Sequence, residues 1–155
     1  MELEISDFQL RRPHWRGRNK LIAGLMEPNK SVIDLGCGAK NLLWYYRNPL
    51  RYLGLDGMPI EEVDMVVDLD SDWRDTVEHN WDYSVNSGIL EWCNGRRLLK
   101  HQKGIAKEYI FTWWPASRPP VRASFDAFES WVEEDYIINE VHDWGPQKVY
   151  KCVSL

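Results

Sequence analysis

Hydrophobic and polar residues along this chain fall into blocks that predict strands alternating with helices. Short runs rich in β-branched and aromatic residues predict strands at 31–35, 51–56, 65–68, 82–87, 108–114, 136–141 and 148–153. Helices are predicted at 19–26, 41–46, 89–102 and 125–132. Such alternation favours parallel strands, whereas the turn residues at 143–147 predict a terminal hairpin. We therefore expect an α/β fold with a seven-stranded, mostly parallel sheet, an antiparallel last strand and helices on both faces.

The length and composition of the chain fit one domain. It has 155 residues, of which 44% are hydrophobic and 28% are charged, as is typical of a packed globular protein. Residues 1–18 show no clear periodicity, and Pro13 interrupts any helix there. We predict an N-terminal arm or lid at 1–18 and a single domain at 19–155.

Charge and cysteine content narrow the classes of partner. With 19 Lys plus Arg against 24 Asp plus Glu, the net charge is -5, which disfavours nucleic acid, and the basic cluster at 11–20 is typical of a solvated face. The sequence has three cysteines and no CxxC pair, so we expect neither disulfides nor a metal site at Cys37, Cys93 and Cys152. This cysteine usage fits a reducing compartment, and we expect a cytoplasmic location. No signal-peptide pattern and no run of about 18 apolar residues occurs, so we expect no membrane contact.

A glycine turn directly after the first strand marks a candidate ligand site. Gly36 and Gly38 occupy this turn, and in open α/β sheets ligands bind beyond the carboxyl ends of the strands. Asp34 precedes Gly36 by two residues, where a carboxylate would repel a pyrophosphate but could hold the amino group of a methionine moiety. The alternative is that Asp34 is a structural acid of the turn.

Acidic residues also end the second and third predicted strands. Asp56 lies 22 positions after Asp34, where an acid can accept hydrogen bonds from both ribose hydroxyls. Asp68 can bond an adenine amino group or flank its pocket, and Leu69 can pack on the ring; a simple turn carboxylate is the alternative for Asp68. The three acids together favour a positively charged nucleoside as the ligand.

Three segments resemble motifs of class I S-adenosylmethionine (SAM)-dependent methyltransferases. The sequence VIDLGCG at 32–38 is similar to their first motif, YLGLD at 52–56 to their second, and WDYSVNSGILE at 81–91 to their fourth-strand motif. The resemblance covers about residues 19–114, and the terminal hairpin suits the antiparallel seventh strand of that family. It implies SAM as cofactor and methyl transfer to a small-molecule, glycan or protein acceptor.

The resemblance also implies which residues bind the cofactor, and the remaining segments supply acceptor candidates. The cofactor set is Asp34, Gly36, Cys37, Gly38, Asp56, Gly57, Asp68, Leu69, Ser87 and Gly88, with Ser87 and Gly88 bordering the transferred methyl group. The chain leaves no length for a separate substrate domain, so acceptor contacts are expected from the arm, the loop after the fourth strand and the segment after Trp114. The acceptor set is His14, Trp15, Tyr45, Glu91, Trp92, Trp113 and Trp114, although most of the 9 tryptophans are expected in the core.

The sequence assigns no catalytic residue. Methyl transfer is an in-line displacement that depends first on alignment, although Glu91 or His14 could take a proton from a hydroxyl or amine acceptor. Lys40 stands close to the glycine turn, where a cation could weaken the binding of a sulfonium. The alternative function is a SAM-binding or degenerate methyltransferase-like scaffold that serves as a protein-interaction module, and a homodimer or a partner protein stays open. Asp34 and Asn41 both oppose a nicotinamide-dependent enzyme.

Overall fold

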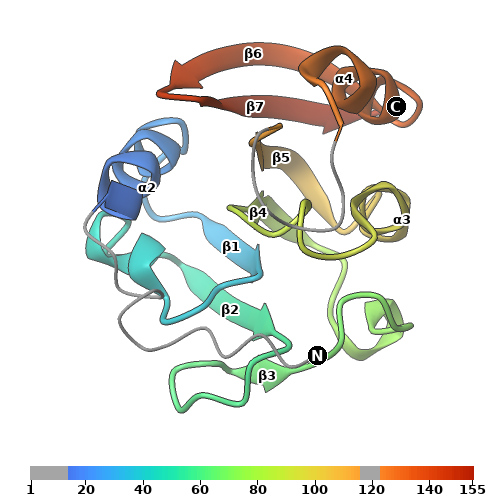
Figure 1. Ribbon diagram of the computed structural model, residues 1–155. Coiled ribbons are helices and arrows are strands. Elements are labelled where there is room, and N and C mark those ends of the chain that lie inside the picture. The colour runs from blue at the N-terminus through green and yellow to red at the C-terminus, as the bar shows by residue number, and fades with distance from the viewer. Residues whose placement is uncertain (1–13, 116–122) are drawn as a thin grey trace.

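One sheet with helices on either side forms the described part of the chain (Figure 1). The computed structural model describes residues 14–115 and 123–155. Its strands are β1 (Ser31–Leu35), β2 (Arg51–Asp56), β3 (Met65–Val66), β4 (Trp81–Asn86), β5 (Ala106–Trp113), β6 (Tyr136–Trp144) and β7 (Gln147–Ser154). Its helices are α2 (His14–Gly24), α3 (Gly95–His101) and α4 (Phe125–Glu133), with the 3-10 helices η1 (Asn41–Trp44) and η2 (Arg74–Thr76).

The strand order confirms the predicted fold class. The seven strands lie in the order β3-β2-β1-β4-β5-β7-β6. Neighbouring pairs from β3 to β5 are parallel, whereas β7 is antiparallel to both β5 and β6. The chain leaves β1 for β2 on one side and later returns to place β4 on the other. The carboxyl end of β1 is therefore the point where the strand order reverses, which is where ligands bind in such sheets.

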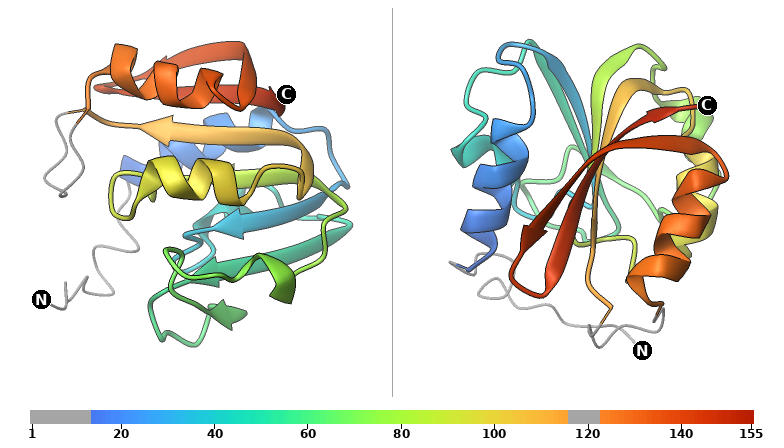
Figure 2. Two further views of the ribbon diagram at one scale, coloured as in Figure 1. Left: turned by 90° about the vertical axis from the view of Figure 1, so that its right-hand side faces the viewer. Right: turned by 90° about the horizontal axis from the view of Figure 1, so that it is seen from above.

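The helices cover opposite faces of the sheet. In Figure 2, α2 lies on one face, and α3 and α4 lie on the other. Successive side chains of β1 point to opposite faces of the sheet and pack against the helices there. Val32 lies in a hydrophobic cluster with Ile22 of α2, and Ile33 lies in a larger cluster with Phe128 of α4. All five residues of β1 are buried, as expected for a central strand covered on both faces.

Helix boundaries differ from the sequence prediction at three places. The helix predicted at 41–46 is a single 3-10 turn, since the chain must become extended before Pro49. The helix predicted at 89–102 begins only at Gly95, because the Asn94 side chain accepts a hydrogen bond from the backbone N–H of Arg97 and caps the helix there. Helix α2 begins at His14, inside the segment predicted as an arm, and residues 1–13 lie outside the described part of the chain.

The terminal hairpin forms as its turn residues predict. Trp144 pairs with Gln147 across a two-residue turn in which Gly145 has a φ of 56°. The hairpin brings β7 back beside β5, and this pairing places the amino end of β7 near the carboxyl end of β5. Gln147 thereby reaches the same edge of the sheet as the glycine turn.

We expect Phe128 to be a main contributor to stability. Its ring is fully buried and stacks on Trp113 with the ring centroids 4.4 Å apart. Phe128→Ala should lower the free energy of unfolding by about 3–5 kcal/mol, measured by denaturant titration. Phe125→Ala, on the same helix but only partly buried, is the matched control. An equal loss for both variants would contradict the packing described here.

Candidate active site at the carboxyl ends of the strands

The turn after β1 is tied to β2 and allows side chains at neither glycine. Gly36 and Gly38 have φ values of 79° and 52°, a region that residues with side chains rarely adopt. The backbone N–H groups of Gly36 and Cys37 both donate to the carbonyl oxygen of Leu55, at 2.7 and 3.1 Å. A Cβ on Gly36 would lie 2.6 Å from Cβ of Ile89, so the segment after β4 packs directly on this turn.

Asp56 joins the glycine turn to the loop after β2. One carboxylate oxygen, Oδ2, accepts a hydrogen bond from the backbone N–H of Gly38 at 2.9 Å, and Oδ1 accepts one from Met58 at 3.0 Å. Each carboxylate oxygen can accept more than one hydrogen bond, so Asp56 retains capacity for further donors. Asp56 thus stands beside the glycine turn, as the sequence predicted for an acid that serves a ribose. Gly57 follows it at an exposed position.

Asp34 is held inside the protein by a tyrosine. The carboxyl is 3% exposed, and its Oδ2 accepts a hydrogen bond from the Tyr52 hydroxyl at 2.7 Å. Burial raises the pKa of Asp34 to about 7; the nearby Asp56 raises it further, and the Tyr52 bond and Lys40 oppose the rise. Asp34 therefore titrates near neutral pH.

Lys40 is compensated by a neighbouring acid. Its ammonium group pairs with the Asp64 carboxylate, whose other oxygen accepts the backbone N–H of Gly54 at 2.8 Å. The ammonium also stands 5.5 Å from the centroid of the Tyr52 ring. Asp64 therefore offsets the cation near the glycine turn. The Cys37 thiol is buried, and burial raises its pKa, which disfavours the reactive thiolate.

Strand β3 is shorter than the predicted 65–68, and Asp68 and Leu69 follow it in different environments. Asp68 is exposed, and its Oδ1 accepts the backbone N–H of Asp70 at 2.9 Å, as in the turn-carboxylate alternative. Leu69 is buried in the main core cluster, and its carbonyl accepts the indole N–H of Trp73 at 3.2 Å. The Asp68 side chain, and not that of Leu69, faces solvent at this strand tip.

The end of β4 meets an arginine that the sequence analysis did not select. Gly88 has a φ of 66°, and its backbone N–H donates to the Thr112 hydroxyl at 2.7 Å. A Cβ on Gly88 would lie 2.9 Å from a guanidinium nitrogen of Arg18, which is 7% exposed and donates to Gln147 at 3.0 Å. Arg18 belongs to the cluster predicted as a solvated face. The sequence did contain a signal that Arg18 would be buried: it lies four residues before Ile22, and residues at this spacing share a helix face.

Glu91 is buried beside Arg18. It is 2% exposed, and its Oε1 accepts the backbone N–H of Trp114 at 2.9 Å. Burial raises the pKa of Glu91 to about 7, although the charge of Arg18 opposes this. Burial also lowers the pKa of Arg18 to about 10, against the opposing effect of Glu91. Glu91 of the loop after β4 and Arg18 of α2 are thus two buried ionisable groups of opposite charge that influence each other electrostatically.

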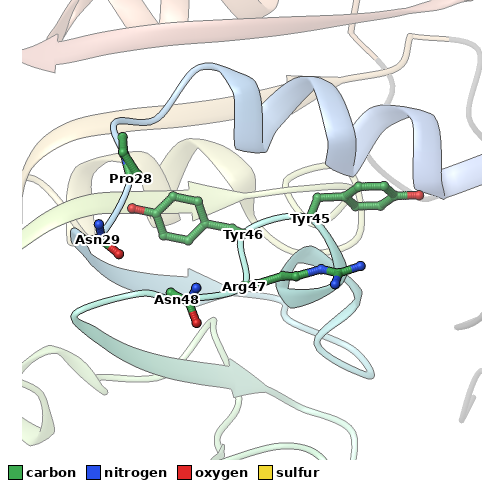
Figure 3. A pocket seen from close by; sticks show the side chains of 6 residues that line it. All are labelled: Pro28, Asn29, Tyr45, Tyr46, Arg47 and Asn48. Atoms are coloured by element: carbon green, nitrogen blue, oxygen red, sulfur yellow. The ribbon is translucent and has the colours of Figure 1, made fainter.

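The structure separates the aromatic acceptor candidates. Trp92 and Trp114 are 41% and 37% exposed, whereas Trp113 is fully buried in the core and offers no surface to an acceptor. Tyr45 lines a pocket of about 340 Å³ beside η1 and the loop before β1 (Figure 3). The residues that line this pocket are Pro28, Asn29, Tyr45, Tyr46, Arg47 and Asn48. His14 and Trp15 are the first two residues of α2, and their side chains lie outside the part of the structure that is described.

Within 14–115 and 123–155, no group of three or more His, Cys, Asp or Glu side chains is arranged to hold a metal ion. Among the helices in these ranges, none has both the length and the apolar character needed to cross a membrane.

The comparisons with known proteins agree on the fold. Magnesium protoporphyrin IX methyltransferase from Synechocystis PCC 6803 with bound SAM matches 99% of this chain and 86% of its own, with a TM-score of 0.71 and 12% identity. The N-methyltransferase NodS from Bradyrhizobium japonicum WM9, in complex with S-adenosylhomocysteine, matches 97% and 93%, with a TM-score of 0.73 and 14% identity. The 1,6-didemethyltoxoflavin-N1-methyltransferase of Burkholderia thailandensis matches 96% and 81%, with a TM-score of 0.74 and 10% identity.

The structural likeness identifies the fold class of the chain. No protein-family profile and no curated protein sequence matches it. The identities to the solved structures are 14% or lower, so the likeness concerns the fold. The chain has the fold of class I SAM-dependent methyltransferases.

We expect a side chain at Gly36 to be poorly tolerated. Gly36→Ala would combine a strained φ with a clash against Ile89, and should lower the free energy of unfolding by about 2–5 kcal/mol. Gly24→Ala is the control, because its Cβ would meet nothing within 4 Å. That variant should match the parent or gain up to about 1 kcal/mol in denaturant titrations. Equal stability of the two variants would refute the described turn.

Asp34 should make stability depend on pH. Since its pKa is raised in the folded state, the folded protein keeps a proton that the unfolded chain has lost between about pH 4 and 7. The free energy of unfolding of the parent, relative to Asp34→Asn, should therefore fall by about 1.4 kcal/mol per pH unit across this range. Denaturant titrations at several pH values measure it, with the exposed Asp75→Asn as control. If the difference in unfolding free energy between the parent and Asp34→Asn does not change with pH, Asp34 is not buried as a protonated carboxyl.

Proposed function

We propose that this protein is a SAM-dependent methyltransferase. The observation that carries the proposal is the hydrogen bond between the Gly38 backbone N–H and the Asp56 carboxylate. It joins the glycine turn of β1 to the acid of β2 at the point where the strand order reverses. The solved structures with this fold include methyltransferases with bound SAM or S-adenosylhomocysteine, which supports the same cofactor here.

The residues at the strand tips suit the parts of this cofactor. Asp56 has free acceptor capacity for ribose hydroxyls, and the exposed carboxylate of Asp68 is available to the adenine amino group. The turn of Gly36, Cys37 and Gly38 lets a methionine moiety approach the backbone, with Asp34 beneath it and Gly57 next to Asp56. Leu69 contributes through its backbone, since its side chain is buried. Ser87 and Gly88 border the transferred methyl group.

Bound SAM supplies a methyl group on a positively charged sulfur. The chain contributes position and electrostatics: the Asp56 carboxylate of β2 places negative charge near that cation, and Asp64 offsets Lys40. Ile89 packs on the glycine turn and sets the distance between the turn and the loop after β4. Alignment of the acceptor with the methyl group is then the task of that loop, of α2 and of the carboxyl end of β5.

Binding of S-adenosylhomocysteine should depend on Asp56. Because hydrogen bonds to a charged group contribute about 1.5–3 kcal/mol, Asp56→Asn should weaken binding by roughly 10- to 150-fold. Isothermal titration calorimetry measures the affinity, and Asp75→Asn, at an exposed carboxylate far along the chain, is the matched control. If the parent protein binds neither SAM nor S-adenosylhomocysteine at millimolar ligand, the proposed function is wrong.

A further inference from the structure

A buried carboxylate oxygen at the end of β4 has unused hydrogen-bonding capacity. Oε1 of Glu91 accepts the backbone N–H of Trp114, whereas Oε2 is buried and has no hydrogen-bond partner among the described residues. Leaving a buried charged acceptor unsatisfied is costly, and native proteins pair nearly all such groups. Oε2 therefore keeps the capacity to accept one more hydrogen bond.

Glu91 belongs to the loop that the proposed function places beside the methyl group. This loop starts at Gly88, against which the guanidinium of Arg18 packs, and continues through Ile89, which contacts the glycine turn. Glu91 follows two residues after Ile89, and its hydrogen bond to Trp114 fixes it to the carboxyl end of β5. The loop thus spans from the proposed cofactor site to Glu91.

The charges around Glu91 restrict the kind of molecule that fits. Glu91 is buried, so a further uncompensated charge brought to its carboxylate would have to be desolvated at high cost. The free position on Glu91 is an acceptor, so the ligand must donate a proton. A carboxylate acceptor lacks that proton, and an amine is mostly a charged ammonium at neutral pH. A hydroxyl group meets both conditions.

We propose, on the basis of the function proposed above, that the methyl acceptor is an uncharged hydroxyl compound and that Glu91 Oε2 accepts its proton. In this step the hydroxyl oxygen forms a bond to the methyl carbon, and the bond from that carbon to sulfur breaks. The sulfur keeps the electron pair, and the hydroxyl proton moves to Glu91. Burial, which brings the pKa of Glu91 to about 7, suits a group that takes up a proton near neutral pH.

The exposed tryptophans next to Glu91 indicate suitable probe molecules. Trp92 follows Glu91 in the chain, Trp114 donates to it, and their side chains are 41% and 37% exposed. Large aromatic surfaces suit rings with apolar faces and polar edges, such as sugars and phenols. Each ring type is obtainable as an uncharged hydroxyl compound and as charged analogues of similar size.

The test compares uncharged and charged probes of the same shape. Methyl glucoside and catechol are the uncharged probes; glucuronate, glucosamine, benzoate and benzylamine are their charged counterparts. Saturation-transfer NMR on the protein loaded with S-adenosylhomocysteine measures binding, and tritium from methyl-labelled SAM measures transfer. We expect the uncharged probes to bind and to receive the labelled methyl group.

The Glu91→Gln variant keeps an oxygen that can accept the Trp114 N–H. It should lower the rate of methyl transfer by about 100-fold or more, while its affinity for S-adenosylhomocysteine stays within about twofold of the parent's. The exposed Glu133→Gln should behave as the parent.

Three results would overturn the inference while the protein still binds S-adenosylhomocysteine. The first is preferential labelling of a charged probe, and the second is the failure of both uncharged probes to bind the loaded protein. The third is transfer by Glu91→Gln at the parental rate. Loss of S-adenosylhomocysteine binding by the parent would instead refute the proposed function, so the two failures are distinguishable.

Discussion

The contact between Gly36 and Ile89 is the constraint on which the candidate site depends. Because the turn after β1 has no side chain at Gly36, the loop after β4 can pack directly on it. The same turn donates two backbone hydrogen bonds to Leu55 and one to Asp56. Three strands that are far apart in sequence therefore end at one place, with their polar groups held by backbone contacts.

Two buried acids give the strand tips their electrostatic character. Asp34 and Glu91 are both removed from solvent, and burial shifts the pKa of each toward neutrality. Their partners differ: Asp34 receives a hydrogen bond from Tyr52, whereas Glu91 faces Arg18 and keeps one oxygen unbonded. One acid is thus held by a side-chain hydrogen bond, and the other keeps unused hydrogen-bonding capacity.

Helix α2 and the terminal hairpin are joined near the carboxyl end of β4. Arg18 of α2 bonds to Gln147 at the start of β7, so the amino-terminal helix and the last hairpin meet over the end of β4.

The sequence alone determined the order of strands and helices, the glycine turn and the acids at the strand ends, because these depend on local alternation and on backbone requirements. It could not separate Trp113, which is in the core, from Trp92 and Trp114, since exposure depends on which face each strand and loop presents. Only the tertiary structure brought Arg18 to Glu91, because this pairing joins segments that share no local pattern.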